Sequence, residues 1–438
     1  MTLGIYERIY MMTFHRAILV VTMFLCIMIS PSVYAADILK QIHPYIRVTG
    51  EYSDNLDLTA DNQKRDFYTT ITPGIKFSNM DARSGVNLDA SAGYVFYSRY
   101  DDLNYVTGNV TLDAKYLTSS HFNFYLRNAF IRSDDPRERE YYTVTQDNKY
   151  VLATETQRAV YWRNVFEPVV EYQFGPENRI GVKYRNNFYH SEDIGNNDST
   201  ENYIGPYLTY WFNRQHGISL DYGYTNGYFE SDPDLNGHRV GGAYMLRFTP
   251  KATASLKGAY TKQNYDDRSG YDSDYEIHET SLGLSYLFSP TLSASVEAGY
   301  YWMEPTIGSK QDGVTFKADI TQLDAHTTYR LSVQGGYIQD LFTSQNLGFR
   351  EYYRATGSIT HFLDRRLSIG CQGSIERAES EPDRRDTIWG AGANISYLPL
   401  QWLQVSLGYD YRQNNTNYSY ASDEYKENRV MLTLTATY

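Results

Sequence analysis

The last ten residues of the chain, 429–438, constrain its fold more than any other segment. Alternate positions are apolar or aromatic, and three of the four residues between them are threonine. Successive side chains of a strand point to opposite faces, so the segment predicts one apolar and one hydroxylated face. A soluble sheet with its apolar face on a core would show the same pattern. The apolar positions are Val430, Leu432, Leu434, Ala436 and Tyr438.

The same alternation recurs along the chain, which argues against the soluble alternative. The alternating runs are about twice the 5–6 residues of an average strand, and a tilted membrane strand needs about 9–11 residues. We therefore predict an all-β, membrane-spanning, antiparallel up-and-down β-barrel of about 20 strands, between about 18 and 22. Clear examples are the runs 180–188, 281–288, 292–302 and 403–412.

Short and long connections alternate between these runs. Short turns on one rim and longer polar loops on the other are typical of bacterial outer-membrane barrels, with the turns in the periplasm and the loops outside the cell. Pro73, Pro168 and Pro206 interrupt strands, and we expect them near rims or bulges because proline cannot donate to the ladder. The short turns are 80–84, 118–121, 175–178, 213–215, 249–251, 289–290, 324–326, 364–366 and 398–401. The longer segments include 133–156, 191–200, 230–236, 266–275, 304–312, 339–349, 379–385 and 414–424.

The N-terminus predicts export. Residues 1–35 show a short basic region, an apolar run and a small-x-small cleavage site, so we expect a cleaved signal peptide followed by one barrel domain, 36–438. Cys26 falls in this signal, which leaves Cys371 alone in the mature chain and excludes an internal disulfide. Cys371 alternates in phase with Ile369, so we expect it to face lipid.

Composition supports the bacterial outer membrane as the location. Tyrosine numbers 44 and aromatic residues make up 16% of the chain, as two aromatic membrane-interface girdles require. A mean hydropathy of -0.54 is too polar for a bundle of membrane helices. The net charge of -12 argues against nucleic acid as a partner.

Polar side chains out of phase with the apolar set should face a water-filled lumen. Both charges occur among them, which favours a passage for hydrophilic rather than lipid-like cargo. Inward-facing tyrosines would slightly favour sugar: the candidates are Tyr97, Tyr125, Tyr189, Tyr203, Tyr207 and Tyr301. The principal lumen candidates are Lys183, Arg185, Glu167, Glu171, Arg239, Arg247, Lys257, Glu297, Asp410 and Arg412, and the lipid-facing candidates of the closing strand are Val430, Leu432, Leu434 and Tyr438. Of the loops, 133–156 is the only one we expect to be long enough to fold inward as a constriction.

No catalytic, cofactor or metal site is expected. His190 and Ser191 form the nearest approach to a base and nucleophile, but no hydrolase signature surrounds them. The segment 232–237 places oxygen ligands at alternate positions like the start of a calcium loop, but Ala243 stands where the closing acid would be needed.

Residues 44–78 carry a more specific pattern, with Pro44-Tyr45-Ile46, then residues 51–56, then Asp66-Phe67-Tyr68 and residues 72–75. This pattern resembles the putative β-barrel porin family 2, outer-membrane proteins often encoded beside exopolysaccharide or capsule genes. The resemblance implies a non-enzymatic pore for export of exopolysaccharide or passage of hydrophilic solutes, with no catalytic residue to carry over. Expected partners are outer-membrane lipid and lipopolysaccharide, the barrel-assembly machinery acting on the C-terminal strand, and polysaccharide with its export-system proteins.

Three alternative functions remain open. A general diffusion porin would have the same fold and a lumen indifferent to sugar. An outer-membrane hydrolase, such as a lipase or protease, would need serine or aspartate with histidine on adjoining strands. A structural or adhesive barrel would have its lumen closed by its own loops.

Overall fold

The computed structural model describes residues 41–118, 121–135, 159–192, 198–266, 274–342, 348–380, 384–417 and 424–438. The predicted signal peptide, the start of the predicted domain at residue 36 and most of segment 133–156 lie outside these residues. Within the described part of the chain, no helix is long and apolar enough to cross a membrane.

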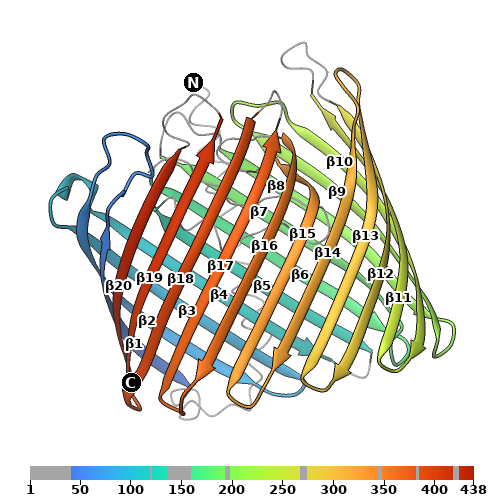
Figure 1. Cartoon of the computed structure of the whole chain (residues 1–438). Coiled ribbons are helices and arrows are strands. Elements are labelled where there is room, and N and C mark those ends of the chain that lie inside the picture. The colour runs from blue at the N-terminus through green and yellow to red at the C-terminus, as the bar shows by residue number, and fades with distance from the viewer. Residues whose placement is uncertain are drawn as a thin grey trace, which may run out of the picture.

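Twenty antiparallel strands form a single closed sheet (Figure 1), which confirms the predicted fold class and strand number. Each strand pairs with its neighbours in sequence, and β1 pairs with β20 to close the barrel. The strands are β1 (Ile42–Ser53), β2 (Asp66–Met80), β3 (Ser84–Tyr97), β4 (Tyr105–Leu117), β5 (Phe122–Ser133), β6 (Tyr161–Gln173), β7 (Arg179–Ser191), β8 (Ser199–Trp211), β9 (His216–Phe229), β10 (Leu235–Thr249), β11 (Ala252–Tyr265), β12 (Tyr275–Ser289), β13 (Leu292–Pro305), β14 (Gln311–Leu323), β15 (Thr327–Asp340), β16 (Gly348–Phe362), β17 (Leu367–Ser380), β18 (Arg384–Leu400), β19 (Leu403–Thr416) and β20 (Tyr425–Thr437).

All nine predicted short turns connect strands at one rim, and the longer segments lie at the other. Two further connections lie at the long-loop rim: residues 54–65 between β1 and β2, and residues 98–104 between β3 and β4, which contain the short 3-10 helix η1 (Asp101–Leu103). The C-terminus lies at the short-turn rim, at the foot of the closing strand (Figure 1).

Large apolar side chains cover the outside of the wall. Leu282, at the middle of β12, is 65% exposed, and Leu432 on β20 is 47% exposed. In water such a surface would be unfavourable, whereas hydrocarbon solvates it and the paired ladder satisfies the backbone. Val430 and Leu434 lie on this outer face, and the side chain of Tyr438 is exposed.

The prediction for the three strand prolines was wrong. Pro73, Pro168 and Pro206 lie at mid-strand, in phase with outward apolar neighbours such as Val170 and Ile204. Each keeps a paired residue on the preceding strand, and the ladder to the following strand skips the proline without a register shift. The closed sheet fixes register on both sides, so a missing N–H breaks the ladder locally and needs no bulge.

The segment that carried the family resemblance stabilises the junction of β1 and β20, the seam of the barrel, at the long-loop rim. Ser53 donates to Glu427 at 2.6 Å, and both oxygens of Asp54 accept hydrogen bonds of 2.7 Å from Asn428. Asn55 donates to the carbonyl oxygen of Lys426 at 3.0 Å. These contacts continue the junction of β1 and β20 beyond the last paired residues.

Candidate functional site

The candidate site is the inner wall of the barrel. The ten predicted lumen residues all lie on the strand face opposite the exposed apolar side chains. The structure groups most of them with an opposite charge on a neighbouring strand rather than leaving them isolated.

The most buried of these groups lies on β6, β7 and β8. Arg185 donates through Nε and Nη2 to Glu201, at 2.9 and 2.6 Å, and its Nη1 lies 3.9 Å from Glu167. Arg185 is 4% exposed and Glu201 is fully buried. The Arg185 guanidinium also lies 5.0 Å from the centre of the Tyr203 ring, so the ring helps to orient it.

Similar pairs line the rest of the wall. Arg239 pairs with Asp221, Lys257 lies 2.5 Å from Glu297, and Arg429 lies 3.1 Å from Asp410. Arg412 follows Asp410 in the same phase of β19 and is half-buried. These pairs join adjacent or next-but-one strands, so they stiffen the wall while keeping it polar.

Arg247 differs because it lies at the short-turn rim. It bonds Glu177 of the β6–β7 turn at 2.7 and 3.1 Å and stacks 4.2 Å from the Trp211 ring. The hydrogen bonds from Arg247 hold the pKa of Glu177 below its usual range. Both groups are accessible, so we expect this pair to contribute little to stability.

A pocket of about 450 Å³ opens on the inner wall of β4 to β8. Lys115, Arg127 and Lys183 bring positive charge to it, and Asp113 and Glu167 bring negative charge. Tyr125 also lines the pocket and is 39% exposed, so its ring is available to a solute.

The six candidate tyrosines lie on the lumen face, but they are not equally accessible. Tyr207 donates to Glu171 at 2.8 Å and lies 5.4 Å from the Lys183 amino group. Rings buried against the wall cannot serve as a surface for a sliding solute, which leaves Tyr125 as the open ring of the set. The buried rings are Tyr97, Tyr189, Tyr203 and Tyr301.

The upper end of β15 separates from β14 and folds into the lumen, while it stays paired with β16, which itself stays paired with β17 up to Arg350. The β14–β15 ladder stops at Phe316 and Gly335, and Gly336 follows with a φ of +141°. Figure 1 shows β14 and β15 diverging toward the long-loop rim. We call described residues 336–342 and 348–351 the inward hairpin.

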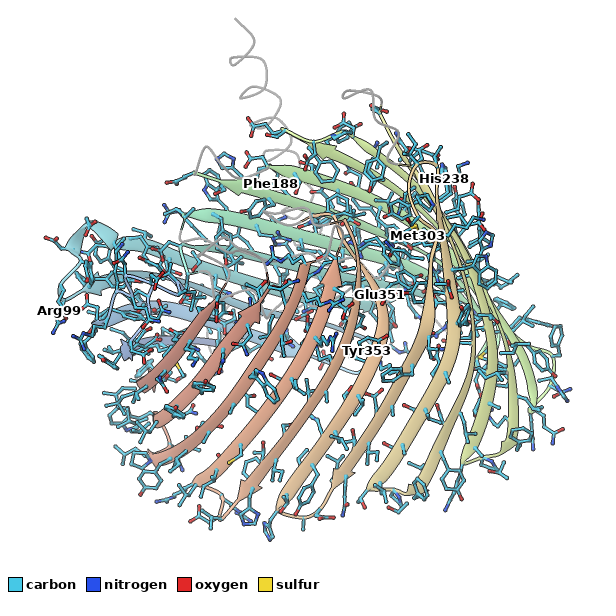
Figure 2. The ribbon with its side chains drawn as sticks, turned by 45° about the horizontal axis from the view of Figure 1, so that its top comes forward. Arg99, Phe188, His238, Met303, Glu351 and Tyr353 are labelled. Carbon is cyan, nitrogen blue, oxygen red and sulfur yellow. The ribbon has the colours of Figure 1, made fainter. Side chains whose placement is uncertain are left out.

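The inward hairpin packs on the inner face of β11, β12 and β13. Tyr337 donates to Glu279 at 3.0 Å, and Tyr301 donates to Glu351. Figure 2, in which the long-loop rim comes forward, shows Glu351 and the neighbouring Met303 toward this rim. Gln339 accepts hydrogen bonds from Gln263 at 2.7 Å and from Tyr275 at 2.9 Å.

Farther along, the inward hairpin reaches β6 and β9. Phe342 is fully buried, stacks on Phe229 at 5.3 Å between ring centroids, and accepts a hydrogen bond from Arg163 at its carbonyl oxygen. Leu341 and Leu235 complete this apolar cluster. The hairpin therefore narrows the lumen on the long-loop side.

The sequence reasoning missed this element. It expected an inward loop only at 133–156, of which residues 136–156 lie outside the described part of the chain. A usable signal was present: Gly335-Gly336 interrupts an otherwise regular strand, and Leu341-Phe342 places apolar residues where a solvated loop would be polar.

The candidate hydrolase pair is not brought together. His190 contacts Asp198 on the outer side of β7, while the buried Ser191 side chain points to the inner side. In the candidate calcium segment, two of the side chains accept hydrogen bonds within the protein. Asp234 accepts one from the backbone N–H of Phe229 at 3.1 Å, and Asn236 accepts one from the Tyr224 hydroxyl at 3.0 Å. Among the described residues, no three side chains of His, Cys, Asp or Glu form a metal-binding group.

Solved structures that match this chain include OccAB2 of Acinetobacter baumannii, at 11% identity and a TM-score of 0.42, covering 91% of this chain and 98% of that chain. OccK3 (OpdO) of Pseudomonas aeruginosa matches at 12% identity and a TM-score of 0.42, covering 92% and 97%. OpdK of Pseudomonas aeruginosa, solved with vanillate, matches at 11% identity and a TM-score of 0.43, covering 91% and 99%. These identities and scores carry no function over to this chain.

A search of curated proteins gave no match. A family model does match, and its description is "Putative beta-barrel porin 2". The match covers residues 247–438, from the end of β10 to the closing strand, and not the segment 44–78 that carried the resemblance. Residues 247–438 are therefore similar to the putative beta-barrel porin 2 family, as the resemblance at residues 44–78 had predicted, and the molecule is a porin-like outer-membrane β-barrel.

Proposed function

We propose that the chain is a non-enzymatic channel through which hydrophilic solutes cross the outer membrane, and that saccharides carrying carboxylates are its preferred cargo. An exported acidic polysaccharide is one such cargo. The proposal deepens the porin-like role by naming the class of solute.

The basic and aromatic pocket on β4 to β8 carries this proposal. Sugar rings present C–H faces that pack on exposed aromatic rings, and a carboxylate is attracted to lysine and arginine. Tyr125 offers an exposed ring, and Lys115 and Arg127 flank it within the same pocket. Several charges elsewhere on the wall are paired with an opposite charge, as in Arg239–Asp221 and Lys257–Glu297, whereas this pocket brings several basic side chains together.

The test is single-channel conductance of the refolded barrel in a planar bilayer. Oligogalacturonate should interrupt the current more often, and for longer, than a neutral maltodextrin of the same length. Arg127→Gln should lower the affinity for oligogalacturonate roughly tenfold, since a hydrogen bond to a charged group contributes about 1.5–3 kcal/mol. Arg330→Gln is the matched control, because Arg330 is an exposed lumen residue on β15 outside the pocket.

The outcomes separate the alternatives. Equal interruption by both sugars would favour a general diffusion porin and refute the preference for acidic saccharides. A barrel that inserts but never conducts would favour a structural or adhesive role. Equal loss of affinity in Arg127→Gln and Arg330→Gln would remove the pocket as the site.

A further inference from the structure

The sequence of β15 is compatible with two positions of the inward hairpin, one in the lumen and one in the barrel wall. Alternation along β15 places Tyr329 and Leu331 on the outer face, where they are 40% and 49% exposed. The same alternation continues to Tyr337, which should then also face outward. In the structure Tyr337 instead lies inside the barrel and is buried.

The change of side occurs at Gly336. Its φ of +141° is available to glycine and strained for other residues. A Cβ at Gly336 would also lie 2.9 Å from the Thr315 side chain. Gly336 is therefore the point at which β15 turns from the wall into the lumen.

The edge of β14 above this point matches the displaced strand. Among the strands that the structure describes, β15 gives β14 no ladder partner above Phe316. If the antiparallel register continued beyond the Phe316–Gly335 pair, Thr315 would lie opposite Gly336, and Val314 would lie opposite Tyr337. Gly313 would next lie opposite Ile338, and Asp312 opposite Gln339.

The faces of these new pairs also agree. Val314 is 51% exposed on the outer face, beside Tyr300 and Trp302 at 42% and 38% exposed. Tyr337 returned to the wall would join these rings, which suit a membrane interface. Ile338 would point inward at the rim, where water reaches it. Returning the hairpin to the wall would therefore expose Ile338 while it places Tyr337 among the aromatic rings of the outer face.

From this register and hinge we infer that the inward hairpin is a gate. In its closed position it lies in the lumen, held by Tyr337–Glu279, Tyr301–Glu351 and the Phe342–Arg163 contact. In its open position β15 extends its ladder along β14, and the hairpin returns to the wall. The two positions exchange internal hydrogen bonds and apolar packing for ladder pairs, which permits a gate with two alternative arrangements.

A disulfide would capture the open position. Directly opposed residues of an antiparallel pair have Cα atoms about 4.5–5.5 Å apart, within disulfide range. Val314→Cys with Tyr337→Cys, in a Cys371→Ser background, should therefore cross-link in the folded barrel under mild oxidation. The cross-linked barrel should conduct at least about twofold better, and a reductant should reverse the gain.

Ile320→Cys with Leu331→Cys is the matched control. These residues are paired on the outer face of the same two strands, so they should cross-link without changing conductance. Failure of the 314–337 pair to cross-link while the control pair does would overturn the gate. Cross-linking that leaves conductance unchanged would also overturn it. The cross-link is read on a gel, so the first result does not depend on which solute the channel carries.

A substitution without engineered cysteines gives a second measure. Tyr337→Phe removes the hydrogen bond to Glu279 and should raise the open fraction roughly tenfold, because that bond favours only the closed position. Tyr329→Phe makes the same chemical change on the wall part of β15 and should leave the open fraction unchanged. Identical channel records from these two variants would count against the gate.

Discussion

At the scale of the residue, the side chains that a strand position tolerates depend on whether the position faces lipid or the lumen. Cys371 and Gln372 are neighbours in β17, and both are exposed. Cys371 lies opposite Ile359 on the outer face, whereas Gln372 lies opposite Ser358 on the lumen face. One therefore meets hydrocarbon and the other meets water.

Arginine at these two positions should have opposite consequences. Cys371→Arg should lower the free energy of unfolding by about 2–4 kcal/mol, because the charge would lie in the apolar band of the membrane. Gln372→Arg at the same depth should change it by less than about 1 kcal/mol, since the charge would lie in the lumen. Urea unfolding in lipid vesicles, followed by tryptophan fluorescence, measures both. Equal costs would contradict the assigned faces.

The buried Arg185–Glu201 pair provides a second prediction at this scale. Glu201→Gln should destabilise the barrel by about 3–5 kcal/mol, because it leaves the buried Arg185 without its main counter-charge. Adding Arg185→Met should recover part of that loss, since the unpaired charge is then gone. The same unfolding assay tests the pair, and a double variant less stable than Glu201→Gln alone would refute this explanation.

At the scale of the element, each strand is held by its two neighbours, so the barrel is weakest where ladders are short. The β14–β15 ladder ends eight pairs above the short-turn rim, where the inward hairpin departs. The β1–β20 seam has nine pairs and joins the two ends of the chain. Side-chain bonds from Ser53, Asp54 and Asn55 reinforce this seam.

Removing one of these bonds should loosen the seam. Asp54→Ala should lower the free energy of unfolding by about 1–2 kcal/mol, because Asn428 loses two hydrogen bonds. Asp61→Ala, in the exposed part of the same loop, is the control and should have little effect. The temperature at which the folded band disappears on an SDS gel compares them. Matching temperatures would indicate that Asp54 does not stabilise the closure.

At the scale of the whole molecule, the net charge of -12 does not describe the passage. Many lumen charges are paired with an opposite charge, whereas the pocket on β4 to β8 carries excess positive charge. Ion selectivity should therefore depend on this pocket more than on the total charge.

Arg127→Glu should shift the zero-current potential in a KCl gradient toward cation selectivity, because it reverses one charge beside the pathway. Arg365→Glu, in an exposed short turn, should shift it much less. The shift should shrink between 0.1 and 1 M salt, because the screening length falls from about 10 to about 3 Å. Equal shifts from both substitutions would show that the pocket does not control selectivity.

The sequence by itself determined the barrel, its nine short turns, its strand count and the polar character of its inner face. These follow from local rules: alternation assigns faces, and turn residues end strands. The inner face of Arg185 and the outer face of Leu432 could be predicted in this way. The partner of Arg185 could not, because Glu201 is chosen by the register between two strands.

Only the tertiary structure decided the positions that alternation leaves open. Alternation assigns Tyr337 to the outer face, yet the strand bends at Gly336 and carries Tyr337 into the lumen. The prolines are a second case, since closure of the sheet fixes their register at mid-strand. In both cases the outcome depends on contacts between residues far apart in the chain, such as Arg163 with Phe342, which a local pattern does not contain.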